Sequence, residues 1–453
     1  MTRSTVQQAV TGEPGIRPPW QVAAEQPRPD TPGLDWFAGR QAAARARIVQ
    51  SGLPEPAEED WRYTSLASFA RRWGEYLSAP AGAVVPEAGD PAPGRLPVGG
   101  HGVTVNIVNG VLRSLPVDGA AGLTIRSLGQ LTADLRGRAE NLLLKTDKTT
   151  PDKLVDLNTA LLGDAILIAT EPGCSPPEAL HVRLKAGTAR LLSQPRLLVD
   201  LAPDSQLTLI LEHTGGSGAL VNAVSQMSLG RGSQLNLIRV QTLPDDGMLL
   251  DTTDMELAEA ASLTVTSVDL GGQLCRQTIA VRLAGPGASA TVNGVFLADG
   301  KRHIDNHTRL LHQAPGTTSR EFFRGIADGH GRGVFNGKII VMPGAAGSNA
   351  ALTNRNLLLA PTAEIDTKPE LEIYVDDVRC SHGATTGQLD PNALFYLRSR
   401  GLDPAIAREV LTSAFLREGL SGIVIPELRL RLEAQLQARL GGEPASKEPG
   451  ATK

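Results

Sequence analysis

The stretch DSQLTLILE, residues 204–212, begins the pattern that decides the fold. A tight turn precedes residues that alternate between apolar and polar, which is typical of a β-strand with one buried face. Related segments recur at spacings of roughly 26 to 31 residues, a range in which repeat architectures are recognised. They are GSQLNL at Gly232, ASLTV at Ala261, GASATV at Gly287, GTTSRE at Gly316 and GSNAAL at Gly347.

A repeat of this length suits one coil of a solenoid that is made of two or three short strands. Each coil stacks on the next and buries a continuous aliphatic core, while Gly, Asp, Asn and Ser occupy the corners. The aromatic content of 4% fits such a narrow interior. A β-sandwich is the structural alternative, but its turns normally come every 8 to 12 residues or so. We therefore expect a mainly β protein with a parallel β-helix core.

Helical patterns flank this core. One helix is expected from Asp35 to Gln50, and a second should carry Leu66, Phe69, Trp73 and Tyr76; all four tryptophans fall in this early region, which suggests a separate aromatic unit. Near the other end, Asp-Pro pairs start two helices and Pro426 a third. The expected regions are a flexible leader (1–30), a helical region with a linker (31–100), the β-helix (101–389), C-terminal helices (390–440) and a disordered tail (441–453).

Composition excludes several classes of protein. A net charge of -4 and the lack of a basic stripe argue against nucleic acid as a partner. No apolar run approaches the roughly 18 residues of a membrane span, and the N-terminus lacks the apolar segment of a signal peptide. Three widely separated cysteines fit free thiols in a reducing compartment. We expect a soluble, cytoplasmic protein.

The segment LEIYVDDVRCSHGATTGQLD, residues 371–390, concentrates the reactive side chains. Leu371, Ile373 and Val375 alternate as in a half-buried strand, which Gly383 should break. Residues two apart share a face of an extended chain, so Cys380 and His382 should project together, as a thiol and an imidazole suited to a soft metal or to sulfur. The alternative is a small buried thiol and a structural imidazole.

The surrounding sequence resembles the SufB/SufD family of iron-sulfur cluster assembly proteins. The resemblance lies in NRNLLLAPTAEIDTKPELEIYVDDVRCSHGATTGQLD and the text that follows to Leu420. It extends upstream through His303, Asp305, His307, Arg324, Gly325 and the run GVFNGKI at Gly333, and near the start it includes PEPAEEDWRYTSL at Pro54. Gly383 stands where the SufB branch carries a glutamate, which favours the SufD branch. The run GAAGSNAALTNRN (Gly344 to Asn356) departs from the glutamine-containing run that is usual in the family.

The resemblance implies a right-handed parallel β-helix and a non-catalytic scaffold for transient iron-sulfur clusters. It implies a SufB-like partner subunit and a SufC-like ATPase held by the C-terminal helices, and it allows self-pairing when the chain is alone. Cys380 and His382 are the expected cluster-assembly residues; because a thiol and an imidazole cannot complete a four-thiolate shell, the other ligands must come from a second subunit. The expected ATPase interface comprises Pro391, Phe395, Tyr396, Arg400 and Phe415.

Other candidate sites are weaker. His303, Asp305 and His307 alternate along a probable strand and could ligate a metal, although a structural or interface role is favoured. The glycine-rich run GHGRGVFNGK lacks the spacing of a phosphate-binding loop, so we expect no nucleotide site. A carbohydrate-active β-helix enzyme is the alternative function, with Asp376 and Asp377 as its acid and base. Adjacent strand residues point to opposite faces, however, which places these two carboxylates poorly.

Overall fold

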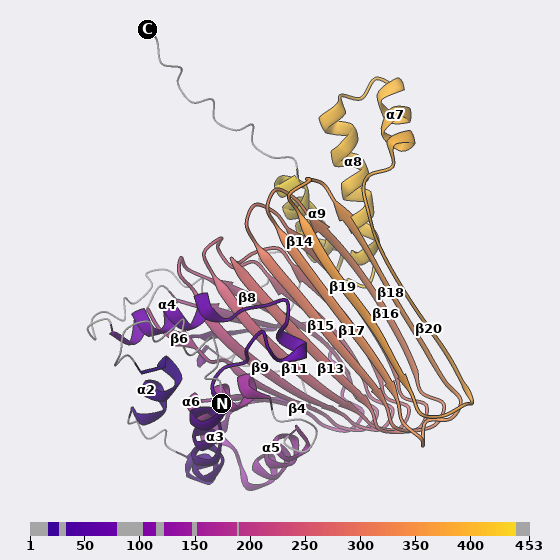
Figure 1. The fold of residues 1–453 in the computed structure, drawn as a ribbon. Coiled ribbons are helices and arrows are strands. Elements are labelled where there is room, and N and C mark those ends of the chain that lie inside the picture. The colour runs from indigo at the N-terminus through magenta and orange to yellow at the C-terminus, as the bar shows by residue number, and fades with distance from the viewer. Residues whose placement is uncertain are drawn as a thin grey trace.

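The structure is a computed structural model that describes residues 17–26, 33–78, 103–114, 122–146, 152–187 and 190–440. The predicted linker beyond Ser78 and the predicted tail from residue 441 lie outside the described residues. Two large β-sheets face each other, and helices pack at both ends of the chain (Figure 1).

Sheet A contains ten strands. In spatial order they are β2 (Val111–Ser114), β1 (Val103–Val108), β5 (Leu180–Ala186), β8 (Gln206–Gly215), β10 (Gln234–Gln241), β12 (Ser262–Asp269), β14 (Ser289–Ala298), β16 (Thr318–Ala327), β18 (Ser348–Leu358) and β20 (Val378–Gly387).

Sheet B faces sheet A and runs in the same direction along the molecule. Its order is β19 (Glu364–Ile373), β17 (Arg332–Val341), β15 (His303–His312), β13 (Leu274–Leu283), β11 (Met248–Leu257), β9 (Leu220–Leu229), β7 (Arg196–Leu201), β4 (Ile166–Thr170) and β3 (Leu123–Ser127), with the short β6 (Leu192–Ser193) beside β9.

The chain alternates between the two sheets, so two strands make one coil of a solenoid. Gln234 pairs with Ser262 in the next coil, Ser262 with Ser289, and Ser289 with Thr318, always in parallel. Apart from β1 with β2 and β3 with β4, the strand pairs given are parallel. The register reproduces the sequence repeat, which confirms the predicted mainly β solenoid and excludes the sandwich.

Every second residue of a strand points into the solenoid, where aliphatic side chains stack in rows. Leu209, Leu237, Val265 and Val292 form one such row across four coils, and all are fully buried. At two positions where the interior accepts an aromatic ring, a stacked neighbour is glycine: Gly325 beside Phe296 and Gly294 beside Phe323. Gly325 lies beside Phe296 in the register, and a Cβ on Gly325 would overlap that ring.

The N-terminal helices pack on the outer face of sheet B rather than forming the separate unit that the tryptophans suggested. Trp20, Trp61 and Trp73 share one core with Leu220 and Leu250 of the solenoid, because the outward rows of these early coils are apolar. The elements are α2 (Pro19–Glu25), η1 (Asp35–Phe37), α3 (Ala38–Ser51), η2 (Glu59–Trp61) and α4 (Ala67–Ser78).

Two expectations about the chain's regions need correction. The predicted leader, 1–30, contains helix α2, which forms because burial of Trp20 fixes it against the core. The predicted β-region contains two helices that strand periodicity missed, α5 (Ala133–Thr146) and α6 (Lys153–Leu161), besides the short η3 (Leu128–Gln130). Asp152 caps α6 by accepting from the backbone amides of Leu154 and Val155.

The C-terminal helices cover the outer face of sheet A. They are α7 (Pro391–Ser399), α8 (Pro404–Arg417), η4 (Glu418–Leu420) and α9 (Pro426–Leu440), and Asp390 and Asp403 cap the first two as their Asp-Pro pairs predict. Leu428, Leu432 and Leu436 of α9 are buried against sheet A. In contrast, α7 has no buried residue and projects beyond the sheets with part of α8 (Figure 1).

Gly325→Ala should destabilise the solenoid by about 1–3 kcal/mol, because the added methyl group meets the buried Phe296 ring. Gly383→Ala is the matched control, since no atom lies within 4 Å of the position that its Cβ would take. Urea unfolding measures both. Equal midpoints for the two variants would show that the glycine beside Phe296 is not required by packing.

A candidate site at the open end of the solenoid

Strand β20 forms the last edge of sheet A and carries both candidate residues. Among the described strands it pairs only with β18, in parallel, so its other side presents backbone groups that none of these strands pairs with. The prediction that Gly383 breaks a strand which starts at Leu371 is wrong. The first strand, β19, ends at Ile373, the chain turns, and β20 runs through Gly383, because the ladder with β18 continues past it.

Cys380 and His382 occupy the inward row of β20, as residues two apart in a strand should. Cys380 stacks beside Ala350 and His382 beside Leu352, both buried residues of the preceding coil. Since no later coil covers them, Cys380 is half-buried and His382 is exposed. Partial burial raises the pKa of the Cys380 thiol. The two side chains therefore lie on the same inward face of β20, at the ends of two neighbouring rows at the open end of the solenoid.

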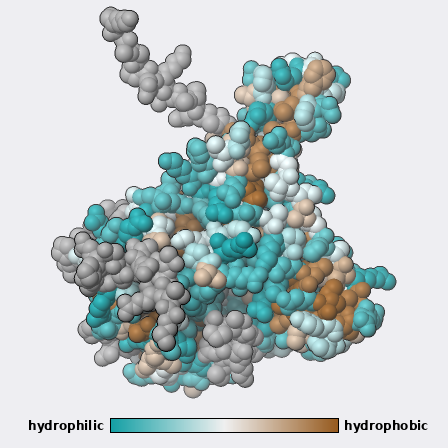
Figure 2. All heavy atoms as spheres, viewed as in Figure 1, coloured by the Kyte–Doolittle hydropathy of each residue, from teal (hydrophilic) through white to brown (hydrophobic). Residues whose placement is uncertain are grey.

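Apolar residues surround this open end. Met342, Ile373 and Tyr374 are exposed by 37%, 43% and 59%, and Tyr374 donates its backbone amide to the carbonyl of Val341. Figure 2 shows apolar surface where the last coils end. Asp376 and Asp377 lie in the exposed turn between β19 and β20 rather than on a strand. The arrangement fits a surface that joins another protein better than a cleft with paired catalytic carboxylates.

The outward face of β15 brings together His303, Asp305 and His307. Their polar atoms already contact other side chains of this protein. Arg276 forms an ion pair with the fully buried Asp305, and its Nη1 lies 2.9 Å from His307 Nε2. Asp305 Oδ1 also lies 2.9 Å from His307 Nε2. A guanidinium within the cluster repels a metal cation, so the favoured structural role agrees with these contacts.

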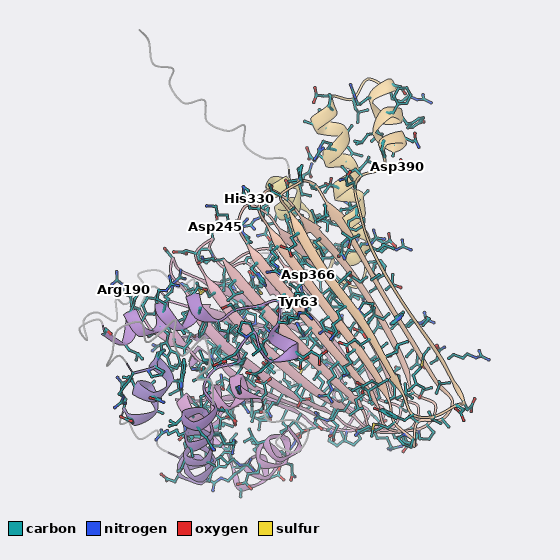
Figure 3. The ribbon with its side chains drawn as sticks, in the orientation of Figure 1. Tyr63, Arg190, Asp245, His330, Asp366 and Asp390 are labelled. Atoms are coloured by element: carbon teal, nitrogen blue, oxygen red, sulfur yellow. The ribbon has the colours of Figure 1, made fainter. Side chains whose placement is uncertain are left out.

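The partner of this cluster is the early segment that contains EEDWRYTSL. The Thr64 hydroxyl donates to Asp305 Oδ2 at 2.5 Å and lies 2.8 Å from His303 Nε2. The Arg276 guanidinium lies 3.7 Å from the centre of the Trp61 ring. Figure 3 labels Tyr63 in this segment, which crosses the outer face of sheet B. The cluster thus anchors the N-terminal region to the solenoid.

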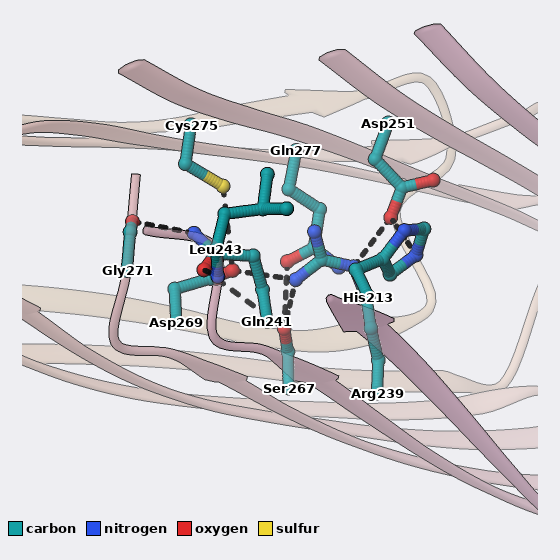
Figure 4. Close-up of polar contacts among 10 residues, drawn as sticks. All are labelled: His213, Arg239, Gln241, Leu243, Asp251, Ser267, Asp269, Gly271, Cys275 and Gln277. Carbon is teal, nitrogen blue, oxygen red and sulfur yellow. Dashed lines mark hydrogen bonds and ion pairs between the residues drawn. The ribbon is translucent and has the colours of Figure 1, made fainter. Parts of the chain in front are cut away.

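A buried polar network inside the solenoid was not anticipated from sequence (Figure 4). Arg239 forms ion pairs with Asp251 and Asp269, and His213 Nε2 lies 3.5 Å from Asp251. Burial lowers the pKa of His213 to about 4 and raises the pKa of the nearby Cys275 thiol. The sequence did contain a signal for this network, namely the position of each residue in its strand. Arg239 and Asp269 continue the series of every second residue that begins with inward apolar side chains in β10 and in β12.

Glu321 is a second buried polar group that the sequence did not single out. It is 3% exposed and stacks between Val292 and Leu352, and Leu352 in turn stacks beside His382. Burial raises its pKa to about 8, and among the described residues only the Thr308 hydroxyl acts in the opposite direction. Glu321 is therefore held as the neutral acid in the folded protein at pH 7.

The described residues contain no group of three or more His, Cys, Asp and Glu side chains that could hold a metal ion. Cys380 and His382 provide two donors, so any metal or cluster held there needs further ligands beyond the side chains that the structure describes around them. No helix within the same residues has the length and apolar character that crossing a membrane requires.

The C-terminal helices present most of the residues that were expected to hold an ATPase. Pro391 and Arg400 are exposed, and Phe395 and Tyr396 are exposed by 72% and 56%. Phe415 differs, because it is half-buried under Arg324. The Arg324 guanidinium lies 4.5 Å from the centre of the Phe415 ring.

Arg324 also donates from Nη1 to the carbonyl of Phe415 at 3.1 Å and forms an ion pair with Glu418. The Arg324 side chain is itself buried. Arg324 therefore ties the end of α8 to β16, while α7 remains free of the sheets.

The fold and the site define a two-sheet β-solenoid protein that presents a thiol and an imidazole on an unpaired edge strand. The family model of the SUF system FeS cluster assembly SufBD core domain matches residues 183–415. The chain belongs to the SufBD family of iron-sulfur cluster assembly proteins. This membership favours cluster assembly over the carbohydrate-active enzyme as the class of function.

Relatives match over most of their length. An iron-sulfur cluster assembly SufBD family protein of Synechocystis is 30% identical over 85% of this chain and 87% of its own. The iron-sulfur cluster assembly protein SufD of Escherichia coli is 28% identical over 87% of this chain and 91% of its own. A chloroplastic protein of Arabidopsis, ABCI7, is 26% identical over 71% of this chain and 70% of its own.

Glu321→Gln should flatten the pH dependence of stability between about pH 4.5 and pH 8. The folded-state pKa is raised above the unfolded value, so the stabilisation is present below the unfolded pKa and is lost as pH rises through about 8. At pH 9 the free energy of unfolding of the variant should exceed that of the wild type by about 2–4 kcal/mol. Urea unfolding across pH measures it, with the exposed Glu427→Gln as control. Parallel pH curves for wild type and Glu321→Gln would contradict the assignment.

Proposed function

We propose that this protein is a scaffold subunit on which nascent iron-sulfur clusters are assembled and from which they are transferred. The observation that carries the proposal is the position of Cys380 and His382, side by side in the inward row of the last, unpaired strand. A thiolate binds iron or sulfane sulfur, and a neutral imidazole ligates iron or moves a proton. The cluster is cargo, held transiently and shared with a second subunit.

A SufB-like subunit is the partner we propose for the open end of the solenoid. An edge strand either is covered or pairs with another strand, and the apolar residues Met342 and Ile373 beside it favour burial against protein. Pairing there would place Cys380 and His382 at a junction that the partner's donors complete. The same edge would allow two copies of this chain to pair when the SufB-like subunit is absent.

A SufC-like ATPase is the partner we propose for α7 and the exposed part of α8. Phe395 and Tyr396 project from a helix that buries none of its residues against the solenoid. Exposed aromatic side chains of this kind are typical of binding hot spots. The ATPase would supply nucleotide hydrolysis, and this chain would act in the cytoplasm as a subunit without a catalytic site of its own.

His382→Ala should abolish cluster assembly by the complex while the solenoid stays folded, because the imidazole is exposed and no core packing depends on it. Cys380→Ser should have a similar effect through loss of the thiolate. The exposed Thr385→Ala on the outward row of the same strand is the matched control. Iron and sulfide content of the co-expressed complex measures assembly, and circular dichroism measures folding. Normal cluster content in the folded His382→Ala complex would contradict the proposal.

A further inference from the structure

Strand β20 is not held in place by burial of its own side chains. None of its ten residues is buried, and Gly383 and Gly387 have no atom within 4 Å of where a side chain would begin. Its inward residues mix apolar and polar types, so the hydrophobic pattern that sets the register of other strands is weak here. Backbone pairing with β18 runs along the whole strand, and side-chain contacts must fix the position of Cys380 and His382 more closely.

The turn from β19 holds the N-terminal end of β20. The backbone amide of Gly347 donates to the carbonyl of Asp377 at 2.7 Å, and the amide of Val378 donates to the carbonyl of Asp376 at 3.0 Å. These bonds lie just before Cys380. They cannot restrain the far end of the strand, where three residues, 388–390, lead to the free helix α7.

At that far end the interior of the solenoid changes from aliphatic to polar. Asn354 and Asn356 of β18 are 0% and 3% exposed and form a reciprocal amide pair, with Asn356 Nδ2 2.6 Å from Asn354 Oδ1. Asn356 Nδ2 also donates to the Thr386 hydroxyl of β20 at 3.4 Å. From the opposite sheet, the Thr367 hydroxyl of β19 donates to Asn354 Oδ1 at 2.8 Å.

These bonds join β18, β19 and β20 across the last coil. Directional hydrogen bonds between buried polar groups favour one geometry, whereas aliphatic packing would tolerate several. The Asn354 amide also donates to the carbonyl of Phe323 at 3.4 Å, which connects the set to the previous coil. Thr386 is thereby linked directly to Asn356 of sheet A and, through Asn354, to Thr367 of sheet B.

We propose that Asn354, Asn356 and Thr367 form a polar latch that positions Cys380 and His382 by holding the C-terminal half of β20 through Thr386. The two reactive residues then lie between fixed ends, the turn before them and the polar latch after them. The functional consequence rests on the proposed role of Cys380 and His382 in cluster assembly. Asn354, Asn356 and Thr367 act as positioning residues and touch no cluster.

Two variants of the full chain test the polar latch by hydrogen exchange. Thr386→Val removes only the exposed acceptor on β20 and leaves the interior intact. Asn354→Leu combined with Asn356→Leu and Thr367→Val replaces all interior members by apolar groups, a change that can be nearly neutral for stability. In both variants the amides of residues 383–387 should exchange roughly threefold to tenfold faster, as expected for loss of one such bond.

The matched control is Ser319→Ala, which removes a buried hydroxyl that lies 2.9 Å from His312 Nε2 in an earlier coil. It should leave exchange of residues 383–387 unchanged. Alkylation of Cys380 by iodoacetamide, followed on its own peptide by mass spectrometry, should accelerate in the two variants of the polar latch and not in the control. Exchange in β8 to β14 should stay the same in all variants.

A rescue distinguishes a positioning role from a general loss of stability. Arg355 and Thr385 are paired in register on the outward row and are both exposed, so Arg355→Cys with Thr385→Cys can form a disulfide that pins β20 to β18. When oxidised, this pin should restore slow exchange and slow Cys380 alkylation to the triple variant, and reduction should remove the rescue.

Unchanged exchange of residues 383–387 in the folded triple variant and in Thr386→Val would overturn the polar latch. Faster exchange in the triple variant that the oxidised disulfide fails to slow would also overturn the polar latch. Should the triple variant fail to fold, Thr386→Val decides alone. These readouts need no cluster, so faster exchange in a chain whose Cys380 and His382 prove dispensable for assembly would reject the proposed function and keep the polar latch.

Discussion

Parallel stacking of one coil on the next in constant register is the constraint on which this structure depends. It places every second residue of each strand in an inward row, and each row continues through the whole solenoid. The row that contains Val265 and Val292 in mid-molecule reaches Leu352 and ends at His382. The site therefore consists of core positions at which stacking stops, which explains why Cys380 is only half-buried and His382 is exposed.

The outward faces of the two sheets have different roles. Sheet B receives the N-terminal helices through the Trp61, Arg276 and Asp305 contacts, whereas sheet A receives α9 and the end of α8. Both faces are covered in the early and middle coils, while the last strand, β20, has an unpaired edge. Exposed apolar side chains include Ile373 and Tyr374 at the open end and Phe395 on α7, the two places where we propose partner subunits.

Sequence reasoning recovered what depends on periodicity and missed what depends on tertiary context. The repeat predicted the coils, Asp-Pro pairs predicted the starts of α7 and α8, and the two-residue spacing placed Cys380 and His382 on one face. Helices α2 and α6 were missed because packing against sheet B fixes them. The Arg239 network and Glu321 were missed because polar side chains at inward positions look like an interruption of the alternation, although their spacing from the apolar residues places them on the inward face. Gly383 was expected to end a strand, yet β20 continues through it because the backbone pairing with β18 continues past this residue.

The most direct test of the account is the alkylation rate of Cys380, measured on its own peptide in the chain alone and in the co-expressed complex with a SufB-like subunit and a SufC-like ATPase. The account predicts moderate labelling of the isolated chain, where the thiol is half-buried. It predicts much slower labelling in the complex, and renewed labelling when ATP shifts the complex toward an open state. Labelling at one rate in all three conditions would mean that the open end of the solenoid is not the junction, and it would contradict the account.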